Sequence, residues 1–306
     1  MIDADLERLI HTIAPRARLL STWPLRGGSS AQMTPFEIDL PDGATKKLVL
    51  SRPGDGYLRR NPQAALEKFR LLEVLHAVGL PTPAPCHLDQ DSSSMVIEYL
   101  DGEVDYGPAD RKDAGRQIAD CLAKIYTIDG DDPRLSFVHQ QIIVLNYMLN
   151  KVSKDIDNSL YLDLIHDALE TKWPPPRANA PTLLHGDFWP GNILWKNGRL
   201  AAVIDWEDAT RGDPFSDLAV SRLDLHMIYG ADAMTAFTER YKALSVTDTT
   251  SLPYWDLYTA QRASPNLDEW GADWYELGRD DITAETMKAA YRTFVEQAFE
   301  ALANFC

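Results

Sequence analysis

The sequence predicts an α+β protein of two domains: a small N-terminal antiparallel sheet with one packed helix, and a larger, mainly helical C-terminal domain. A chain of 306 residues is long enough for a large core that divides in two. Up to residue 100, short apolar runs alternate with turn residues, whereas apolar residues recur at helical spacing through most of the remainder. We therefore expect domains at 1–100 and 101–306.

Five segments are expected in the N-terminal domain. The pattern predicts a helix over 2–14, a hairpin over 19–37, a third strand over 46–52, a helix over 61–78 and a strand over 94–100. The first helix ends before Pro15, and the second opens at Asn61-Pro62, because a helix tolerates proline only in its first turn. Asp101-Gly102 ends the last strand, and the domain boundary is placed there.

The C-terminal domain is expected to begin with helices and to contain one hairpin. Apolar spacing predicts helices over 108–128, 139–150 and 158–170. Two short apolar runs then flank Lys196-Asn197-Gly198, a sequence typical of a tight hairpin turn. Asp213 is expected to cap the next helix, because aspartate at this position accepts from a free backbone N–H group.

Composition limits the partners and the compartment. There are 30 basic and 46 acidic residues, so the net charge is −16, which disfavours nucleic acid and anionic membrane as partners. Such a surface would attract a cationic substrate, although acidic residues also serve solubility alone. The cysteines Cys86, Cys121 and Cys306 are odd in number and widely spaced, which predicts no disulfide framework and fits a reducing cytoplasm. The sequence predicts neither a membrane span nor a signal peptide.

The stretch from Leu183 to Asp208 carries the residues that indicate chemistry. His185-x-Asp187-x-x-x-x-Asn192 precedes and enters the first strand of the hairpin, and Asp205 follows the second. A carboxylate such as Asp187 can orient an attacking hydroxyl and accept its proton. Magnesium prefers oxygen ligands, and Asn192 and Asp205 supply them. The pattern therefore predicts a catalytic carboxylate beside a magnesium site.

These motifs, with the Ile-Asp-Trp sequence around Asp205, resemble the central signature of the aminoglycoside phosphotransferase and choline kinase family, within the protein-kinase-like superfamily. The resemblance covers most of the chain and is most specific over 183–219. It implies a two-lobed kinase-like fold and phosphoryl transfer from ATP or GTP, with Mg²⁺, to a hydroxyl group of a small molecule. It also implies that Asp217 braces the catalytic loop. His185 is expected to hold backbone carbonyls.

The resemblance also implies a nucleotide site in the N-terminal lobe. The loop Gly27-Gly28-Ser29-Ser30 lies where relatives cover the phosphates with backbone N–H groups. Relatives place a cation on the third strand to pair with the phosphates, but Ser51 occupies that position here. Arg52, turned inward by a bulge, is the preferred replacement, and Lys47, on the same strand face as Ser51, is the alternative.

Two further segments complete the expected nucleotide site. Glu67 shares a helix face with apolar residues and needs a partner, and the resemblance implies that it pairs with the strand-three cation. A surface glutamate at the edge of that face is the alternative reading. The strand that contains Glu98 and ends at Leu100 corresponds to the hinge whose backbone binds adenine in relatives.

Aromatic and acidic residues in the C-terminal helices point to the acceptor. Aromatic faces combined with carboxylates suit an ammonium or sugar substrate. Trp270 and Trp274, in a glycine-containing segment, are candidate lid residues, whereas Tyr254, Trp255 and Tyr258 fit a core helix better. Three readings stay open: an antibiotic kinase, a metabolic kinase of the choline, amino-alcohol or sugar type, and a nucleotide-binding pseudokinase that serves as a binding module.

Overall fold

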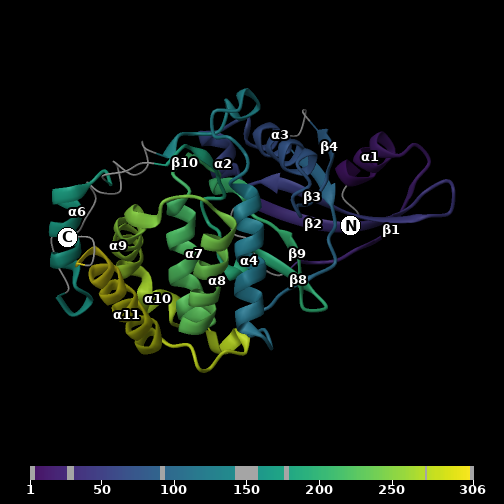
Figure 1. Ribbon diagram of the computed structural model, residues 1–306. Helices are drawn as coiled ribbons and strands as arrows, with labels where there is room; N and C mark the ends of the chain where they lie inside the picture. The colour runs from purple at the N-terminus through teal and green to yellow at the C-terminus, as the bar shows by residue number, and fades with distance from the viewer. Residues whose placement is uncertain are drawn as a thin grey trace. The chain divides into compact units, whose positions relative to one another are not determined.

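The computed structural model describes residues 4–25, 31–89, 94–141, 158–175, 179–272 and 274–303. The chain forms two compact units, Met1–Asp101 and Gly102–Cys306. Both units combine helices and strands, as expected of an α+β protein (Figure 1). The expected loop at 27–30 and most of the expected helix at 139–150 lie outside the described residues.

The N-terminal unit is built on one antiparallel sheet of five strands. Its strand order is β1-β2-β3-β5-β4. The elements are α1 (Ala4–Ile13), β1 (Arg18–Thr22), β2 (Ala31–Asp39), β3 (Thr45–Pro53), α2 (Asp55–Arg60), α3 (Ala64–Ala77), β4 (Pro85–Asp89) and β5 (Ser94–Glu98). The expected strands are confirmed, whereas α2 was not predicted and α3 begins after the turn at Asn61-Pro62 rather than within it.

An apolar cluster fixes α1 against the sheet. Leu6, Leu9 and Ile10 of α1 are buried together with the sheet residues Phe36 and Leu48. Phe36 and Leu48 lie opposite each other in the β2–β3 pairing, so the cluster spans both strands. The apolar spacing that predicted the first helix is thus the face that packs on the sheet.

The C-terminal unit is mainly helical, with two small sheets. Its strands form the pairs β10-β7 and the order β6-β8-β9. The helices are α4 (Arg111–Ile125), α6 (Leu162–Lys172), α7 (Phe215–Ile228), α8 (Ala231–Leu244), α9 (Leu252–Ala263), α10 (Leu267–Trp270) and α11 (Ala284–Ala303). The strands are β6 (Glu103–Val104), β7 (Thr182–Leu184), β8 (Ile193–Lys196), β9 (Arg199–Val203) and β10 (Thr210–Gly212). Short 3₁₀ turns lie at Pro133–Leu135, Asn158–Leu160, Pro190–Asn192, Trp206–Asp208, Thr249–Ser251, Ser264–Asn266 and Trp274–Leu277.

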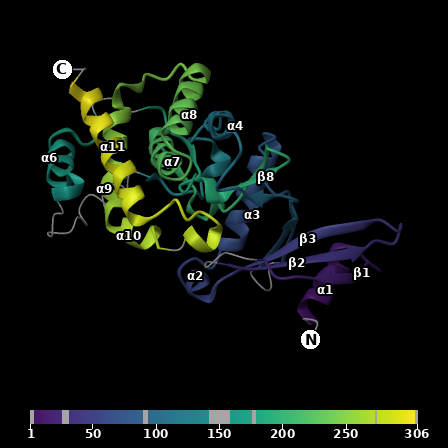
Figure 2. The same cartoon turned by 90° about the horizontal axis from the view of Figure 1, so that it is seen from below.

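Helix α7 is the centre of this unit. It contacts α8, α9 and α11, and Figure 2 shows it surrounded by them. Most of its side chains are buried, including polar ones such as Asp217 and Ser221. The helix carries Asp217 near its N-terminus and further polar residues along its length, so it is the scaffold on which the surrounding loops are fixed.

A buried ion pair joins α7 to α9. The Arg222 guanidinium donates to both carboxylate oxygens of Asp256, at 3.1 and 3.2 Å, and also to the Thr238 hydroxyl of α8. Asp256 is only 3% exposed. Because removing one charge of such a pair leaves the other buried and unpaired, the contact fixes how these helices pack.

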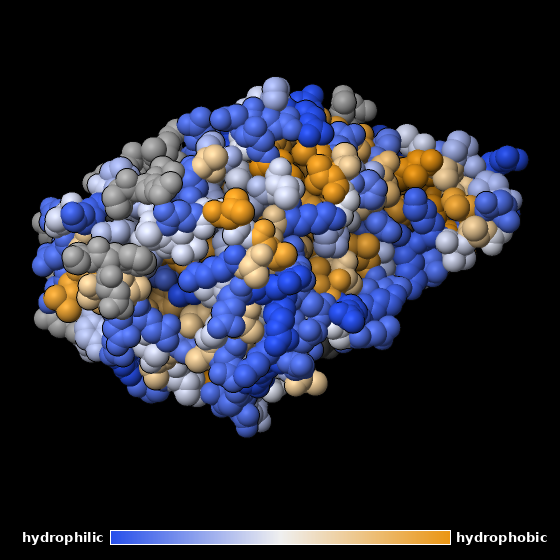
Figure 3. Space-filling view, in the orientation of Figure 1, coloured by the Kyte–Doolittle hydropathy of each residue, from blue (hydrophilic) through white to orange (hydrophobic). Residues whose placement is uncertain are grey.

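The surface agrees with the acidic composition. Figure 3 shows one face that is mostly hydrophilic, with apolar residues in separate patches. None of the helices in the described ranges combines the length and apolar character that a membrane span requires.

Candidate active site

A hairpin brings Asn192 and Asp205 to the same end of one small sheet. Strands β8 and β9 pair with Ile193 opposite Val203, and the Ile204 amide donates to the Asn192 carbonyl at 3.0 Å. The turn predicted at the other end is confirmed. Asn197 and Gly198 both have positive φ, which a tight two-residue hairpin turn requires.

Asp187 and Asn192 are held together by the loop between β7 and β8. The Asn192 side-chain amide donates to the Asp187 carbonyl at 2.8 Å and to its carboxylate Oδ2 at 2.9 Å. The 3₁₀ turn Pro190–Asn192 brings the two residues close, and its proline and glycine allow so tight a loop. The sequence spacing therefore predicted a real side-chain pair.

The electrostatics around Asp187 are balanced between opposing effects. Burial raises the pKa of Asp187, and the nearby Asp208 carboxylate raises it further. Hydrogen bonds from Asn192 and from the Trp189 side chain lower it, as does the positive charge of Arg262. A carboxylate whose pKa is raised accepts a proton more readily, which suits a group that receives the proton of an attacking hydroxyl.

Asn192 and Asp205 fit a magnesium ion by their chemistry. The Asn192 amide nitrogen already donates to Asp187, and its oxygen accepts no hydrogen bond within the described part of the chain. Asp205 lies two residues after Val203, the last residue of β9; it adopts a left-handed conformation with φ 65°, and its side chain is exposed. Two oxygen donors at one end of a hairpin suit Mg²⁺, which keeps waters and phosphate oxygens as its other ligands. The described residues contain no cluster of three or more His, Cys, Asp or Glu side chains that could form an all-protein metal site.

Asp217 and His185 support the loop around Asp187, as expected. The Asp217 carboxylate accepts from the His185 amide at 2.6 Å and from the Gly186 amide at 3.1 Å. His185 Nε2 is 2.9 Å from the Ile204 carbonyl, so the imidazole ties the loop to the strand that leads to Asp205. Burial raises the pKa of Asp217 to about 7, against the lowering effect of the two amides. Both residues act on the backbone of the site.

Gly186 is required where the loop passes Asp208. Its φ is +87°, and a Cβ at this position would lie 1.9 Å from the Asp208 carbonyl oxygen. No other residue fits both the conformation and the space. Asp213, in contrast, does not occupy the N-cap position expected of it, which belongs to Pro214, although Asp213 still accepts from the Phe215 amide at 2.9 Å.

Asp187 opens onto a cavity of about 530 Å³ within the C-terminal unit. Apolar side chains of α7, α9, α11 and the segment after α10 form most of its wall. They are Val220, Leu223, Met227, Ile228, Ala263, Leu277 and Met287. Three indole rings join them, from Trp189, Trp270 and Trp274. Trp274 is buried and Trp270 is 42% exposed, so the tryptophan pair singled out in the sequence does line the site.

Two charged residues that the sequence analysis missed, Asp224 and Arg262, also line the cavity. Burial raises the pKa of Asp224 to about 8, and the Asp187 charge adds to this effect, whereas Arg262 opposes it. Asp224 makes no hydrogen bond within the described ranges, so its carboxyl group is available to a ligand. Asp224 shares a side of α7 with the cavity residues Val220, Leu223 and Met227, and a single apolar face there could have drawn attention to it. Because α7 is buried on nearly every side, its sequence shows no such single face.

Trp255 and Tyr258 are core residues, as expected, whereas Tyr254 of the same helix is only partly buried. Both are buried in α9, at 2% and 1% exposed, and Trp173 packs against both rings. They do not line the cavity.

The strand-three residues of the N-terminal unit occupy distinct environments. Ser51 is 1% exposed, and its hydroxyl has no partner in the described part of the chain. Lys47 is exposed, with its ammonium 4.0 Å from Asp101 and 5.7 Å from the centre of the Tyr99 ring. Arg52 is partly buried and continues β3 in regular pairing with Gln32, without the bulge that was expected to turn it. The choice between Arg52 and Lys47 thus stays a prediction.

The other expected nucleotide residues are placed within the same unit. Glu67, in the first turn of α3, accepts from the Asn61 side-chain amide at 2.6 Å. Glu98 ends β5, and its carboxylate accepts from the Ala84 amide at 3.3 Å. Leu100 follows it in the segment that ends this unit. The pairing of Glu67 with a strand-three cation stays a prediction.

The fold and the loop geometry fit the chemistry of a phosphotransferase. A comparison with protein families identifies the group: the profile described as the phosphotransferase enzyme family matches residues 24–255. The chain belongs to this family, whose members transfer phosphoryl groups to hydroxyl groups of small molecules.

Sequence relatives include proteins of two kinds. Acyl-CoA dehydrogenase family member 10 of Mus musculus is 25% identical over 250 residues, which cover 74% of this chain and 23% of that protein. The chain thus spans about a quarter of the length of this relative. An aminoglycoside 3'-phosphotransferase of Enterococcus faecalis is 24% identical over 202 residues, covering 61% of this chain and 75% of that one.

Solved structures with the same fold bear the names of small-molecule kinases. A macrolide 2'-phosphotransferase of Brachybacterium faecium superposes with a TM-score of 0.61 at 17% identity, over 98% of both chains. Choline kinase of Streptococcus pneumoniae gives 0.60 at 17% identity, over 98% of both chains. A phosphotransferase in ternary complex with streptomycin and ATP gives 0.58 at 18% identity, over 87% of this chain and 90% of that one.

Proposed function

We propose that this protein transfers the terminal phosphoryl group of ATP, or GTP, to a hydroxyl group of a small molecule bound in the cavity beside Asp187. The observation that carries this proposal is the placement of Asp187. Its carboxylate is fixed by Asn192 at 2.9 Å and faces a cavity large enough for a substrate. An acceptor hydroxyl placed there would be oriented by Asp187 and would lose its proton to it.

Asn192 and Asp205 would hold Mg²⁺ through their side-chain oxygens. When bound, Mg²⁺ neutralises phosphate charge as the phosphoryl group leaves. The free oxygen of Asn192 supports this assignment, because its nitrogen is already used to orient Asp187. One amide thus serves both the metal and the carboxylate, and this explains why the motif needs asparagine rather than a second aspartate.

The N-terminal unit would bind the nucleotide. We assign the loop Gly27-Gly28-Ser29-Ser30 to the phosphates and the backbone of Glu98 and Leu100 to the adenine or guanine base. Arg52 would contact the phosphates in place of the cation that relatives carry at Ser51, and Glu67 would orient Arg52. The buried Ser51 hydroxyl has no hydrogen-bond partner in the described part of the chain. This supports the view that serine here replaces the charged residue that relatives carry at this strand position.

The lining of the cavity favours an amphipathic acceptor. Apolar and indole side chains form most of the wall, and Asp224 and Arg262 contribute charge. A molecule with many charges would lose its own hydration in this cavity without covering the apolar wall. A molecule with an apolar body would bury that wall instead. We therefore expect acceptors with a hydroxyl group attached to an apolar frame.

A second candidate is an amino alcohol of the choline type. Asp224 favours it, because its unpartnered carboxyl lies in a cavity that also contains indole rings. An ammonium group would restore the charge on Asp224 and could pack against an indole face. The net charge of −16 would also attract such a cation.

The protein would act in the cytoplasm, without nucleic acid or membrane as partner. Cys86 and Cys121 are free thiols, and burial raises the pKa of both, most strongly that of Cys121, to about 12. Thiols of this kind persist in a reducing compartment.

The test is a coupled ADP-release screen with ATP and Mg²⁺ over macrolides, aminoglycosides, hydroxylated apolar acids, choline-like amines, amino alcohols and sugars. We expect acceptor-dependent ADP release with at least one apolar hydroxyl compound, and loss of that release in Asp187→Asn. Turnover only with polycationic aminoglycosides would contradict the amphipathic acceptor. Nucleotide binding without turnover for any acceptor would support the pseudokinase reading instead.

A further inference from the structure

We propose that Arg279 is a positioning residue for the acceptor: it fixes the segment that closes one side of the cavity beside Asp187. This segment, residues 270–272 and 274–282, is called the cap below. The proposal rests on the proposed function, because it takes the cavity as the acceptor site. Arg279 does not itself line the cavity, so it would act on the acceptor through the side chains of the cap.

The cap contributes three large side chains to the cavity. Trp270, Trp274 and Leu277 line it, and most of the remaining wall comes from α7 and α9. Trp274 is buried, whereas Trp270 and Leu277 are 42% and 52% exposed. These two side chains meet both the cavity and the solvent, so the cap forms part of the cavity mouth.

The cap is a loop whose base is closed against α11. A Cβ on Gly271 would lie 2.2 Å from the Ala284 nitrogen, so the start of the cap passes close to the start of α11. Asp268, just before the cap, pairs with Lys288 of α11 at 2.6 Å. A loop that is held only at its base can turn about that base. Its place over the cavity therefore depends on a contact further along the cap.

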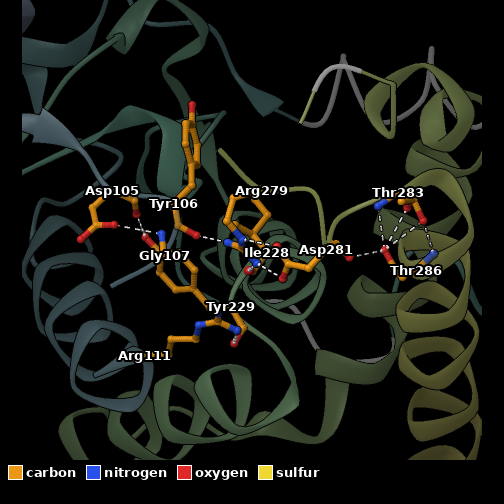
Figure 4. A network of polar contacts seen from close by, with 10 residues as sticks. All are labelled: Asp105, Tyr106, Gly107, Arg111, Ile228, Tyr229, Arg279, Asp281, Thr283 and Thr286. Carbon is orange, nitrogen blue, oxygen red and sulfur yellow. Dashed lines mark hydrogen bonds and ion pairs between the residues drawn. The ribbon is translucent and has the colours of Figure 1, made fainter. Parts of the chain in front are cut away.

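Arg279 supplies this contact through hydrogen bonds to two distant segments. Figure 4 shows its guanidinium donating to the carbonyl oxygens of Tyr106 and Ile228, the second at 2.9 Å. The same group makes a fork of 2.7 and 2.8 Å to the Asp281 carboxylate. Arg279 is only 8% exposed, so these hydrogen bonds are shielded from water. One planar cation thus joins the cap to two other parts of the C-terminal unit.

The Ile228 carbonyl is well suited to accept from this cation. Ile228 is the last residue of α7, and the last carbonyls of a helix have no partner within the helix. The negative end of the helix dipole also favours a positive charge there. Because Ile228 lines the cavity as well, Arg279 attaches the cap at the edge of the acceptor site.

The turn around Tyr106 is fixed before the cap reaches it. The Tyr229 phenol donates to the Asp105 carbonyl, and the Gly107 amide donates to the Asp105 carboxylate at 2.9 Å (Figure 4). The Tyr106 ring meets the Trp274 ring of the cap edge to face, with centroids 5.1 Å apart. The turn that accepts from Arg279 therefore also positions the buried tryptophan of the cavity wall.

Loss of Arg279 should weaken acceptor binding and spare the rest of the reaction. Without its donors the cap is no longer attached to α7 and to the turn around Tyr106. An acceptor would then have to order the cap as it binds, and this cost reduces its affinity. Asp187 is held by Asn192, outside the cap, so the orientation of its carboxylate should persist.

The first test compares Arg279→Met with the matched control Arg134→Met. Arg134 makes the same kind of fork to a carboxylate two residues away, that of Asp132, but it is exposed and does not line the cavity. With the acceptor that gives the highest kcat/KM in the ADP-release screen, we expect the acceptor KM to rise roughly ten- to a hundredfold in Arg279→Met. The KM for ATP should stay unchanged, as should both KM values in Arg134→Met. A wild-type acceptor KM in Arg279→Met would overturn the proposal.

Two milder variants keep the test decisive, because Arg279 is buried and Arg279→Met also removes stability. Arg279→Lys keeps the charge but cannot form the planar fork, and Asp281→Asn leaves both carbonyl contacts in place. The acceptor KM should rise most in Arg279→Met, less in Arg279→Lys and least in Asp281→Asn. A residue that served stability alone would lower the Tm and the active fraction, and hence kcat, with no change in the acceptor KM. That pattern would contradict a positioning role.

Amide hydrogen exchange tests the attachment of the cap without any acceptor. Peptides that cover residues 274–282 should exchange faster in Arg279→Met than in the wild type and in Arg134→Met, because the cap opens more often. Unchanged exchange in these peptides would refute the anchoring role.

Asp187→Asn, measured in the same kinetic assay, separates this inference from the proposed function. Wild-type kcat in Asp187→Asn would refute the proposed function itself. An inactive Asp187→Asn combined with an unchanged acceptor KM in Arg279→Met would refute the role of Arg279 alone.

Discussion

Replacing Asp256 by asparagine is expected to destabilise the C-terminal unit strongly. Asp256 is 3% exposed, and the Arg222 guanidinium binds both its oxygens at 3.1 and 3.2 Å. Removing one charge of a buried pair leaves the other unpaired and typically costs about 3–5 kcal/mol. For a unit of this size, each kcal/mol lowers the Tm by roughly 2–4 °C, so the expected fall in Tm is about 6–20 °C.

Thermal unfolding followed by circular dichroism measures this change directly. The matched control is Asp120→Asn, because the Arg240–Asp120 pair is even shorter, at 2.6 Å, but exposed. That control should change the free energy of unfolding by less than about 1 kcal/mol. Equal Tm shifts for Asp256→Asn and Asp120→Asn would refute the argument from burial. Since α7 and α9 both line the cavity, Asp256→Asn should also raise the KM for the acceptor.

Three further predictions concern the site. Gly186→Ala should reduce kcat by more than about a hundredfold, since its Cβ would meet the Asp208 carbonyl at 1.9 Å; near-normal kinetics would contradict the loop geometry. Asp205→Ala should abolish magnesium-dependent turnover, and an unchanged dependence of rate on magnesium concentration would reject the metal assignment. Arg52→Ala should lower kcat/KM for ATP by roughly ten- to a hundredfold while Lys47→Ala changes it little, and the reverse order would assign the phosphates to Lys47.

The geometry of the loop from Asp187 to Asn192 could be predicted from the sequence because it is local. Asp187 and Asn192 lie five residues apart, and one turn brings them together. The hairpin that places Asp205 beside Asn192 was equally predictable, since Asn197 and Gly198 are the residues that a turn with positive φ demands. Local spacing and turn chemistry thus sufficed for the three residues at the centre of the site.

The acceptor cavity could not be predicted, because it depends on contacts between distant segments. Tyr106 stacks on Trp189 across 83 positions of sequence, and Arg279 reaches the Tyr106 carbonyl across 173. Asp224 lies on a helix that is buried on nearly all sides, so its apolar pattern does not reveal which face meets the cavity. Trp270 and Trp274 were found only because indole rings beside glycine and acidic residues suggested a lid.

The regular pairing of β3 at Arg52 shows that a strand position alone did not reveal how this side chain is oriented. The sequence suggested a bulge that would turn this side chain inward, but β2 and β3 pair without interruption from Asp39 and Thr45 to Ala31 and Pro53. Alternation along a strand fixes which side chains share a face, and the structure keeps that alternation here. How the phosphates are neutralised therefore remains for the Arg52 and Lys47 variants to decide.

The most direct test of the central claim is the kcat of Asp187→Asn with an acceptor identified in the screen, at saturating ATP and Mg²⁺. Asparagine preserves the shape of the side chain but cannot take the proton of the acceptor hydroxyl. Loss of a general base typically costs ~100- to 10,000-fold. We predict a fall of this size with unchanged nucleotide affinity by calorimetry. A variant that keeps more than about a tenth of the wild-type kcat would contradict the assignment of Asp187.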